Sequence, residues 1–257
     1  MRTLIACVAT TALAALSATS EARDAPSDMA NLGRAVADTT RPAADTARDA
    51  NRKPLETLAF AGIRAGDKIA DYIANSGYFT RLFAAAVGPG GFVYAVEPTE
   101  IVTFPNVAPA YARLKDWAKT QTNVTVMTVP AAQGLAFPQQ LDVFWISQNY
   151  HDLHDSFAKP ADLAIVNKKV FDALKPGGLF IVLDHAAEKG SGLRDTETLH
   201  RIDEAAVKSE VVAAGFKLAG ESNILRNSAD PRTAKVFDPS IRHRTDQFIL
   251  IFRKPKH

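Results

Sequence analysis

From residue 67 onward, short apolar runs alternate with longer stretches in which apolar residues recur at helical spacing. This alternation is typical of parallel strands joined by crossover helices. The runs that predict strands are 68–73, 91–97, 123–129, 141–147, 179–184, 216–222 and 246–253. The stretches that predict helices are 78–87, 107–119, 161–174 and 199–214. The pattern therefore predicts an α/β fold built around a mainly parallel sheet.

Two turns show where predicted helices end and strands begin. Residues 175–178 read Lys-Pro-Gly-Gly, in which proline stops a helix and glycine gives the backbone the freedom to turn. Residues 213–216 read Ala-Ala-Gly-Phe and predict the same event before the next strand.

The segment before the sheet has a different pattern. Residues 22–53 are rich in Ala, Arg and Asp, and two prolines interrupt them, which predicts short helices joined by turns. Pro54 suits the first turn of a further helix, which Gly66 ends. We therefore expect residues 23–66 to form a helical segment packed on the core, and residues 67–257 to form the main domain.

The N-terminus has the layout of a secretory signal peptide. Arg2 precedes a mostly apolar stretch over 4–16, and small residues follow at 18–22. The apolar stretch is too short to span a bilayer, so we expect cleavage rather than a stable membrane anchor. The predicted signal peptide is 1–22, and the mature chain would be exported, in the periplasm. The alternative is a buried N-terminal helix.

Composition narrows the functional classes. The 257-residue chain is 47% hydrophobic and 23% charged, which is ordinary for a globular protein. Its 30 basic and 28 acidic residues give a formal net charge of +2, so nothing indicates a nucleic-acid partner. Cys7 is the single cysteine and falls in the predicted signal peptide. The mature chain would then have no disulfides, thiolate nucleophiles or cysteine-ligated metals.

Several segments, in this order and spacing, resemble class I S-adenosylmethionine-dependent methyltransferases, in particular an exported bacterial group described as predicted methyltransferases. The likeness covers residues 28–255. The segments that carry it are Asp71-Tyr72-Ile73-Ala74-Asn75-Ser76-Gly77-Tyr78-Phe79-Thr80, Val93–Glu97, Leu174-Lys175-Pro176-Gly177-Gly178 and Ala214-Gly215-Phe216. The resemblance implies a Rossmann-like, mainly parallel seven-stranded sheet flanked by helices, with the last strand antiparallel.

The resemblance also implies S-adenosylmethionine as cofactor and a small molecule as substrate. Glu97 ends the second predicted strand, 20 residues after Gly77, where an acidic side chain would bond the ribose hydroxyls. The alternative for Glu97 is an ordinary surface glutamate. The expected cofactor-binding residues are Asp71, Asn75, Gly77, Tyr78, Glu97 and Asn149.

The chain departs from the family in the loop after the first strand. The family pattern is D-x-G-x-G-x-G, and here only Asp71 and Gly77 match it, because Ile73 and Asn75 stand where the first two glycines belong. Side chains at these positions would enter space that the cofactor needs, and we expect a lower affinity. A second departure is the Val-Pro-Ala-Ala run at 129–132, which offers no acidic side chain to adenine.

A dense polar run, Gln-Asn-Tyr-His-Asp-Leu-His-Asp at 148–155, follows the fourth predicted strand. Ligands of such folds bind at the carboxyl ends of the strands, so this run is the leading catalytic candidate. We expect His151 to act as general base, Asp152 to orient it and Tyr150 to shape the pocket. His185 ends the neighbouring strand and joins them as a catalytic candidate. The alternative is that the run only caps the next helix.

Three functions remain open on the sequence. The first is a methyltransferase acting on an unknown acceptor outside the cytoplasm. The second is a non-catalytic or repurposed small-ligand-binding protein of the same fold with a degenerate cofactor loop. The third is a metal-dependent enzyme that uses His151, His154 and His185, although the leading interpretation assigns no metal ligand. His200 opens a predicted helix and is either a lid element or part of a solvated face.

Overall fold

The structure, a computed structural model, describes residues 25–131, 135–158 and 162–256. A central seven-stranded sheet has the order β3-β2-β1-β4-β5-β7-β6. Its strands are β1 (Lys68–Tyr72), β2 (Phe92–Pro98), β3 (Val124–Val129), β4 (Leu141–Ser147), β5 (Leu174–His185), β6 (Lys217–Ser222) and β7 (Gln247–Arg253). Strands β1 to β5 pair in parallel, and β7 runs antiparallel to both β5 and β6. The predicted fold, with its antiparallel last strand, is confirmed.

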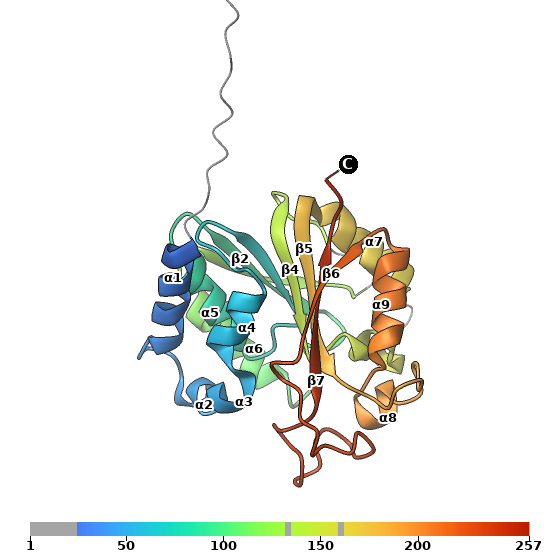
Figure 1. Ribbon diagram of the computed structural model, residues 1–257. Coiled ribbons are helices and arrows are strands. Elements are labelled where there is room, and N and C mark those ends of the chain that lie inside the picture. The colour runs from blue at the N-terminus through green and yellow to red at the C-terminus, as the bar shows by residue number, and fades with distance from the viewer. Residues whose placement is uncertain (1–24, 132–134, 159–161, 257) are drawn as a thin grey trace, which may run out of the picture.

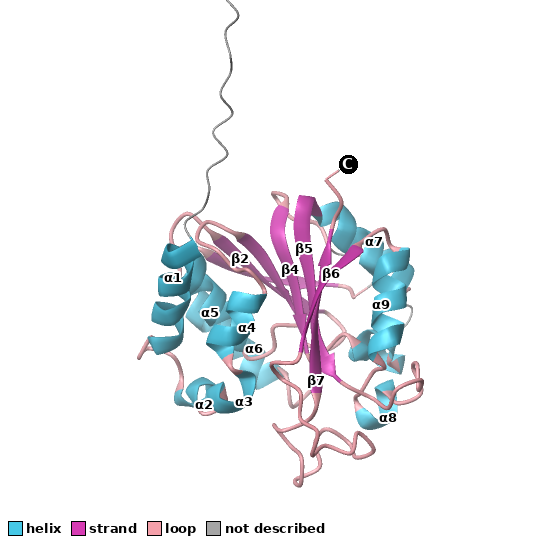
Figure 2. Ribbon diagram, in the orientation of Figure 1, coloured by secondary structure: helices cyan, strands magenta, loops and turns pink. Residues whose placement is uncertain are grey.

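Helices cover both faces of the sheet (Figures 1 and 2). Helices α1, α4 and α5 pack on one face, and α7 and α9 pack on the other. The helices are α1 (Ala25–Ala37), α2 (Ala43–Thr46), α3 (Asp49–Arg52), α4 (Pro54–Phe60), α5 (Tyr78–Val87), α6 (Ala108–Ala118), α7 (Leu163–Ala173), α8 (Thr196–Leu199) and α9 (Glu204–Ala213).

The two-residue period of the strands divides the core between these faces. In β4, Val143 and Trp145 face α5, whereas Phe144 and Ile146 face the side of α7 and α9. All four side chains are at most 2% exposed, which explains why the strand reads as a continuous apolar run.

The segment before β1 packs on the α5 face. Leu32 of α1 and Leu58 of α4 are buried in the same cluster as Phe83 and Val87 of α5. Because this segment also carries α2 and α3 to the carboxyl ends of the strands, its polar residues border the site described below.

Element ends differ from the prediction in one informative place. The predicted helix 199–214 begins only at Glu204, as α9, because the Asp203 side chain accepts a hydrogen bond from the backbone N–H of Ala205 and caps the helix there; Leu199 instead ends the short helix α8. The predicted signal peptide 1–22 lies outside the described residues. Among the residues that are described, no helix is both long and apolar enough to cross a bilayer.

Candidate functional site

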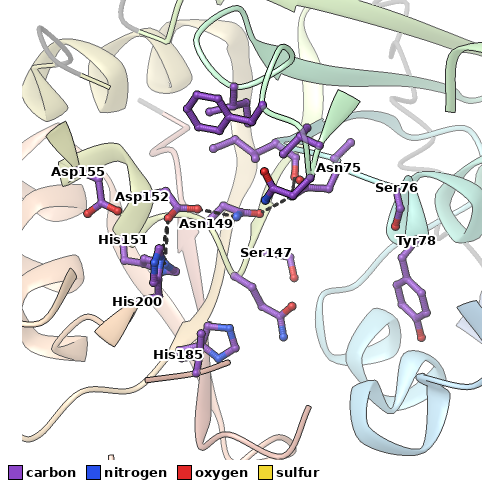
Figure 3. A pocket seen from close by; sticks show the side chains of 18 of the residues that line it. Asn75, Ser76, Tyr78, Ser147, Asn149, His151, Asp152, Asp155, His185 and His200 are labelled. Carbon is purple, nitrogen blue, oxygen red and sulfur yellow. Dashed lines mark hydrogen bonds and ion pairs between the residues drawn. The ribbon is translucent and has the colours of Figure 1, made fainter. Parts of the chain in front are cut away.

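A cavity of about 580 Å³ lies at the carboxyl ends of the central strands (Figure 3). Its lining includes the loop after β1, the residues that follow β4, and His185 at the end of β5. The volume is within the range of ligand pockets, and ligands of doubly wound sheets bind at this edge. This cavity is therefore the candidate site.

In the β1–α5 loop, two residues other than glycine adopt the left-handed backbone conformation that glycine usually supplies. Strand β1 ends at Tyr72, and Ile73, Asn75 and Gly77 have φ values of 58°, 53° and 77°. Asparagine tolerates this left-handed region, but a β-branched isoleucine is a rare occupant and is strained there. Ile73 therefore turns the chain and does not extend the strand.

Packing explains why the third position remains glycine. A Cβ on Gly77 would collide with the Leu114 side chain of α6, so glycine is needed there for space as well as for its φ. Ile73 instead has room: it is 4% exposed, packs in the core and also contributes to the cavity lining. Its backbone N–H donates to the Val96 carbonyl at 2.7 Å, which ties the turn to β2.

Two buried carboxyls lie behind this loop. Asp71 accepts a hydrogen bond from the Thr80 hydroxyl at 2.6 Å, and burial raises the pKa of Asp71 to about 7. Glu97 has no exposed surface, and burial raises its pKa to about 8. One Glu97 oxygen, Oε1, accepts from the backbone N–H of Asn75, while the other has no hydrogen-bond partner among the described residues. Glu97 thus bonds the loop and does not line the cavity, so its expected bond to the ribose hydroxyls stays a prediction.

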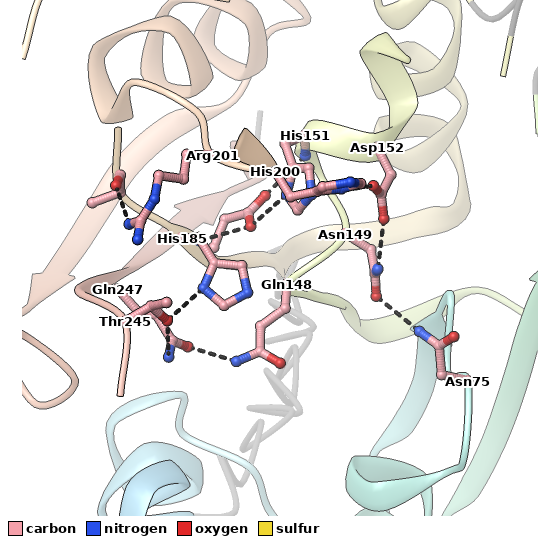
Figure 4. Close-up of polar contacts among 12 residues, drawn as sticks. Asn75, Gln148, Asn149, His151, Asp152, His185, His200, Arg201, Thr245 and Gln247 are labelled. Carbon is pink, nitrogen blue, oxygen red and sulfur yellow. Dashed lines mark hydrogen bonds and ion pairs between the residues drawn. The ribbon is translucent and has the colours of Figure 1, made fainter. Parts of the chain in front are cut away.

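The polar run after β4 forms one hydrogen-bonded chain across the cavity (Figures 3 and 4). The Asn75 side-chain amide donates to Asn149 Oδ1 at 3.0 Å, and Asn149 donates to Asp152 Oδ2 at 2.7 Å. Asp152 Oδ1 lies 3.1 Å from His151 Nε2 and 3.3 Å from His200 Nδ1. The structure therefore connects the predicted cofactor loop to the predicted catalytic run.

His151 is held by a buried carboxylate on its other side. Its Nδ1 lies 2.8 Å from Asp184 Oδ1, and its backbone N–H donates to Asp184 Oδ2 at 2.8 Å. Burial disfavours the charged imidazolium, but the charges of Asp184 and Asp152 outweigh burial and raise the pKa of His151 well above its ordinary value. His151 is therefore fixed between two carboxylates, and its expected role as general base stays a prediction.

The other predicted catalytic side chains occupy different surroundings. His185 lines the cavity, its Nδ1 lies 2.7 Å from the Thr245 hydroxyl, and burial lowers its pKa to about 3. Tyr150 is fully buried and donates to Glu210 at 2.9 Å, so in the described structure it does not line the cavity. His154 also contacts Glu210, at 3.2 Å. The histidines 151, 154 and 185 are therefore not gathered around one point.

Sequence reasoning missed two parts of the lining. Arg48 and Arg52 reach the cavity from the helical segment before β1. Their spacing of four residues places both on one face of a helix, and this was the sequence signal that could have identified them. Arg52 donates to Gln148 Oε1 at 2.6 Å and lies 4.5 Å from the centre of the Tyr78 ring. Burial lowers its pKa to about 10. The second missed part is an apolar wall that includes Ile101, Phe104, Val107 and Phe157.

Solved structures with a similar fold are methyltransferases. An S-adenosylmethionine-dependent methyltransferase from Aquifex aeolicus aligns with a TM-score of 0.52 at 15% identity, over 77% of this chain and 87% of that one. The N-methyltransferase NodS from Bradyrhizobium japonicum aligns with a TM-score of 0.51 at 13% identity, over 81% and 96%. The chain has the fold of the S-adenosylmethionine-dependent methyltransferases.

A third neighbour was solved with the cofactor. The glycopeptide N-methyltransferase MtfA, in complex with S-adenosylmethionine, aligns with a TM-score of 0.51 at 15% identity, over 78% of this chain and 86% of that one. No protein-family model matches the sequence. No curated protein matches it either. At these identities the likeness establishes the fold, and the activity has to be argued from the site.

Proposed function

We propose that the chain binds S-adenosylmethionine in the 580 Å³ cavity and transfers its methyl group to a small acceptor. The observation that carries the proposal is the β1–α5 loop. Ile73, Asn75 and Gly77 all have the left-handed backbone that the family's three glycines would supply, and the loop borders the cavity. A strained isoleucine that keeps this turn indicates that the loop's shape is needed.

The described residues offer a partner to each part of the cofactor. Arg52 forms no ion pair with any described carboxylate and lines the cavity, where it can bind the carboxylate of the amino-acid part. The Asn75 side chain, which lines the cavity, can bond the ribose hydroxyls in place of the buried Glu97. The apolar wall around Ile101 and Phe104 suits a planar base. The residues present therefore fit the group.

When bound, S-adenosylmethionine supplies an electrophilic methyl group. The contribution of the chain is to hold an acceptor nucleophile in line and to exclude water. Asn149 and His185 also line the cavity and can hydrogen-bond an acceptor. His151 and Asp152 also line the cavity.

A repurposed small-ligand-binding protein is the second candidate, and Ile73 is the observation that favours it. The Ile73 side chain borders the cavity at a position where the family has no side chain, and Glu97 is closed off behind the loop. Replacing Ile73 with glycine distinguishes the candidates, because an obstructed methyltransferase should gain affinity for the cofactor, whereas a repurposed site should not.

Action outside the cytoplasm is part of the proposal and rests on the first 22 residues. Expression of the full chain in a Gram-negative host, followed by fractionation and mass determination of the mature N-terminus, tests it. A processed chain in the periplasmic fraction supports export, and a full-length chain that stays in the cytoplasmic fraction contradicts it.

Calorimetric titration with S-adenosylmethionine and S-adenosylhomocysteine tests the binding itself. We expect both to bind the wild type, and Arg52→Gln to weaken both by about tenfold or more, because a charge-assisted hydrogen bond contributes about 1.5–3 kcal/mol. Arg64→Gln, which removes an exposed arginine outside the cavity, is the matched control and should leave both affinities unchanged. The absence of heat from either ligand at millimolar concentration would refute the proposal.

A further inference from the structure

Three donor atoms of different side chains converge at one end of the cavity (Figure 4). His151 Nε2 lies 3.1 Å from Asp152 Oδ1 and 3.3 Å from His200 Nδ1. His200 Nδ1 lies 3.3 Å from Asp152 Oδ1, so the three atoms form a triangle. Within the described part of the chain, these three side chains form the one group of His, Cys, Asp or Glu residues whose potential metal-ligand atoms lie close enough together to hold an ion.

The triangle has the dimensions of one face of a metal coordination sphere. Zinc binds histidine nitrogens and carboxylate oxygens at about 2.0–2.2 Å, and tetrahedral geometry then places neighbouring donors roughly 3.3–3.5 Å apart. The three observed separations, 3.1, 3.3 and 3.3 Å, are close to that spacing. Two imidazoles and one carboxylate are also a donor set that first-row divalent cations accept.

Neighbouring residues orient each donor toward the same point. Asp184 bonds Nδ1 of His151, which leaves Nε2 directed at the triangle. Asn149 donates to Oδ2 of Asp152, which leaves Oδ1 directed there as well. The Phe237 ring contacts the His200 ring, with centroids 5.0 Å apart. A carboxylate behind a ligating histidine is the usual outer shell of a metal site, since it fixes the ring's tautomer and orientation.

Charge and an unpartnered atom favour a cation at this point. Asp155 is 3% exposed, lines the same cavity, and its Oδ1 has no hydrogen-bond partner among the described residues. Asp152, Asp155 and Asp184 thus place three buried or nearly buried carboxyls around two imidazoles. Because buried carboxylates require compensation, an additional positive charge would stabilise the group.

We propose that His151, Asp152 and His200 bind a divalent first-row transition-metal cation of the Zn²⁺ type. All three residues line the cavity, so the open coordination position faces the cavity. The set corrects the metal hypothesis drawn from the sequence, because His154 and His185 lie outside it. The metal proposal does not rest on the proposed binding of S-adenosylmethionine.

Direct metal titration tests the proposal. The full chain is purified without a metal-affinity tag, dialysed against a chelator, and titrated with Zn²⁺ in competition with a chromophoric chelator and with Co²⁺ by visible absorption. We expect one ion per chain, a Co²⁺ spectrum of low coordination number, and an increase in the thermal midpoint on adding Zn²⁺. Asp184→Asn should weaken Zn²⁺ binding by about 10–100-fold, as loss of a supporting carboxylate does elsewhere.

The variants His200→Ala and Asp152→Asn should lose the Co²⁺ spectrum and the stoichiometric Zn²⁺ binding. His200 is about a quarter exposed, so its truncation should leave the chain folded, which far-ultraviolet circular dichroism checks. His154→Gln, which alters a histidine outside the triangle, should bind as the wild type does. Failure of the wild type to bind either cation, or variants at His200 and Asp152 that bind like the wild type, would overturn the proposal.

Discussion

Ile73 allows a sharp test of the strained loop, because alanine and glycine at this position should be nearly equal in stability. Both variants lose the buried side chain beyond Cβ, at a cost of about 2–5 kcal/mol. Glycine also loses the Cβ methyl group, at about 0.8 kcal/mol, and raises the entropy of the unfolded chain by about 0.4–1 kcal/mol. Against this, alanine at a φ of 58° keeps the left-handed penalty of about 1–2 kcal/mol, whereas glycine does not. These opposing contributions offset each other, so Ile73→Gly and Ile73→Ala should differ by less than about 1 kcal/mol.

Urea denaturation at equilibrium measures this difference, with the m-value as a check that the unfolding transition is unchanged. At a buried position with ordinary backbone, alanine would be the more stable of the two by about 1.2–1.8 kcal/mol. In a thermal scan that advantage would correspond to roughly 4 °C for a domain of this size. If Ile73→Ala is more stable than Ile73→Gly by that amount, the strain argument is wrong and the loop is not held in the left-handed conformation.

Two further predictions concern buried charges. The pKa of Glu97 lies near 8 in the folded chain, above its ordinary 4.5, so folding stability should decline as pH rises between these values, by at most about 1.4 kcal/mol per pH unit. Glu97→Gln should remove that decline in urea titrations, and profiles that run parallel for the two proteins would contradict it. Arg201 and Asp230 form a fully buried ion pair at 2.9 Å. Arg201→Ala should therefore cost about 3–5 kcal/mol of unfolding free energy, whereas Lys119→Ala, at an exposed pair, should cost less than about 1 kcal/mol; similar losses in both would contradict the difference.

The strands and the edge that carries the site could be predicted because both follow from local pattern. Buried parallel strands read as apolar runs, and the polar residues directly after them must lie at the carboxyl edge. This argument placed Asn149, His151 and Asp152 at the cavity before any contact was known. For Glu97 it predicted a bond to the ribose hydroxyls, whereas the structure shows this side chain bonded to the loop after β1 and outside the cavity lining.

The rest of the site depends on contacts between distant segments. His200 reaches the cavity from the loop between α8 and α9, and Arg52 reaches it from α3, more than 90 residues before its partner Gln148. No local pattern fixes such pairings. The same holds for Tyr150, whose neighbours in the sequence line the cavity while its own hydroxyl is satisfied by Glu210 and Asn167.

The loop itself shows why residue identity was a poor guide to backbone shape. The predicted first strand included residue 73, yet Ile73 lies beyond the end of β1, and both Ile73 and Asn75 have positive φ. The anchoring contacts explain the outcome, since the Ile73 N–H bonds β2 and the Asn75 N–H bonds Glu97. Surrounding structure can impose a conformation that the residue alone disfavours.

The central claim is that the cofactor binds at this loop, and hydrogen exchange of the wild type with and without S-adenosylhomocysteine tests it most directly. We predict slower amide exchange on ligand addition over residues 73–78 and 97–107, which border the 580 Å³ cavity. A second cavity of about 620 Å³, lined by residues that include Ala47, Arg113 and Trp117, provides the internal comparison. Unchanged exchange throughout, or protection confined to that second cavity, would contradict the account.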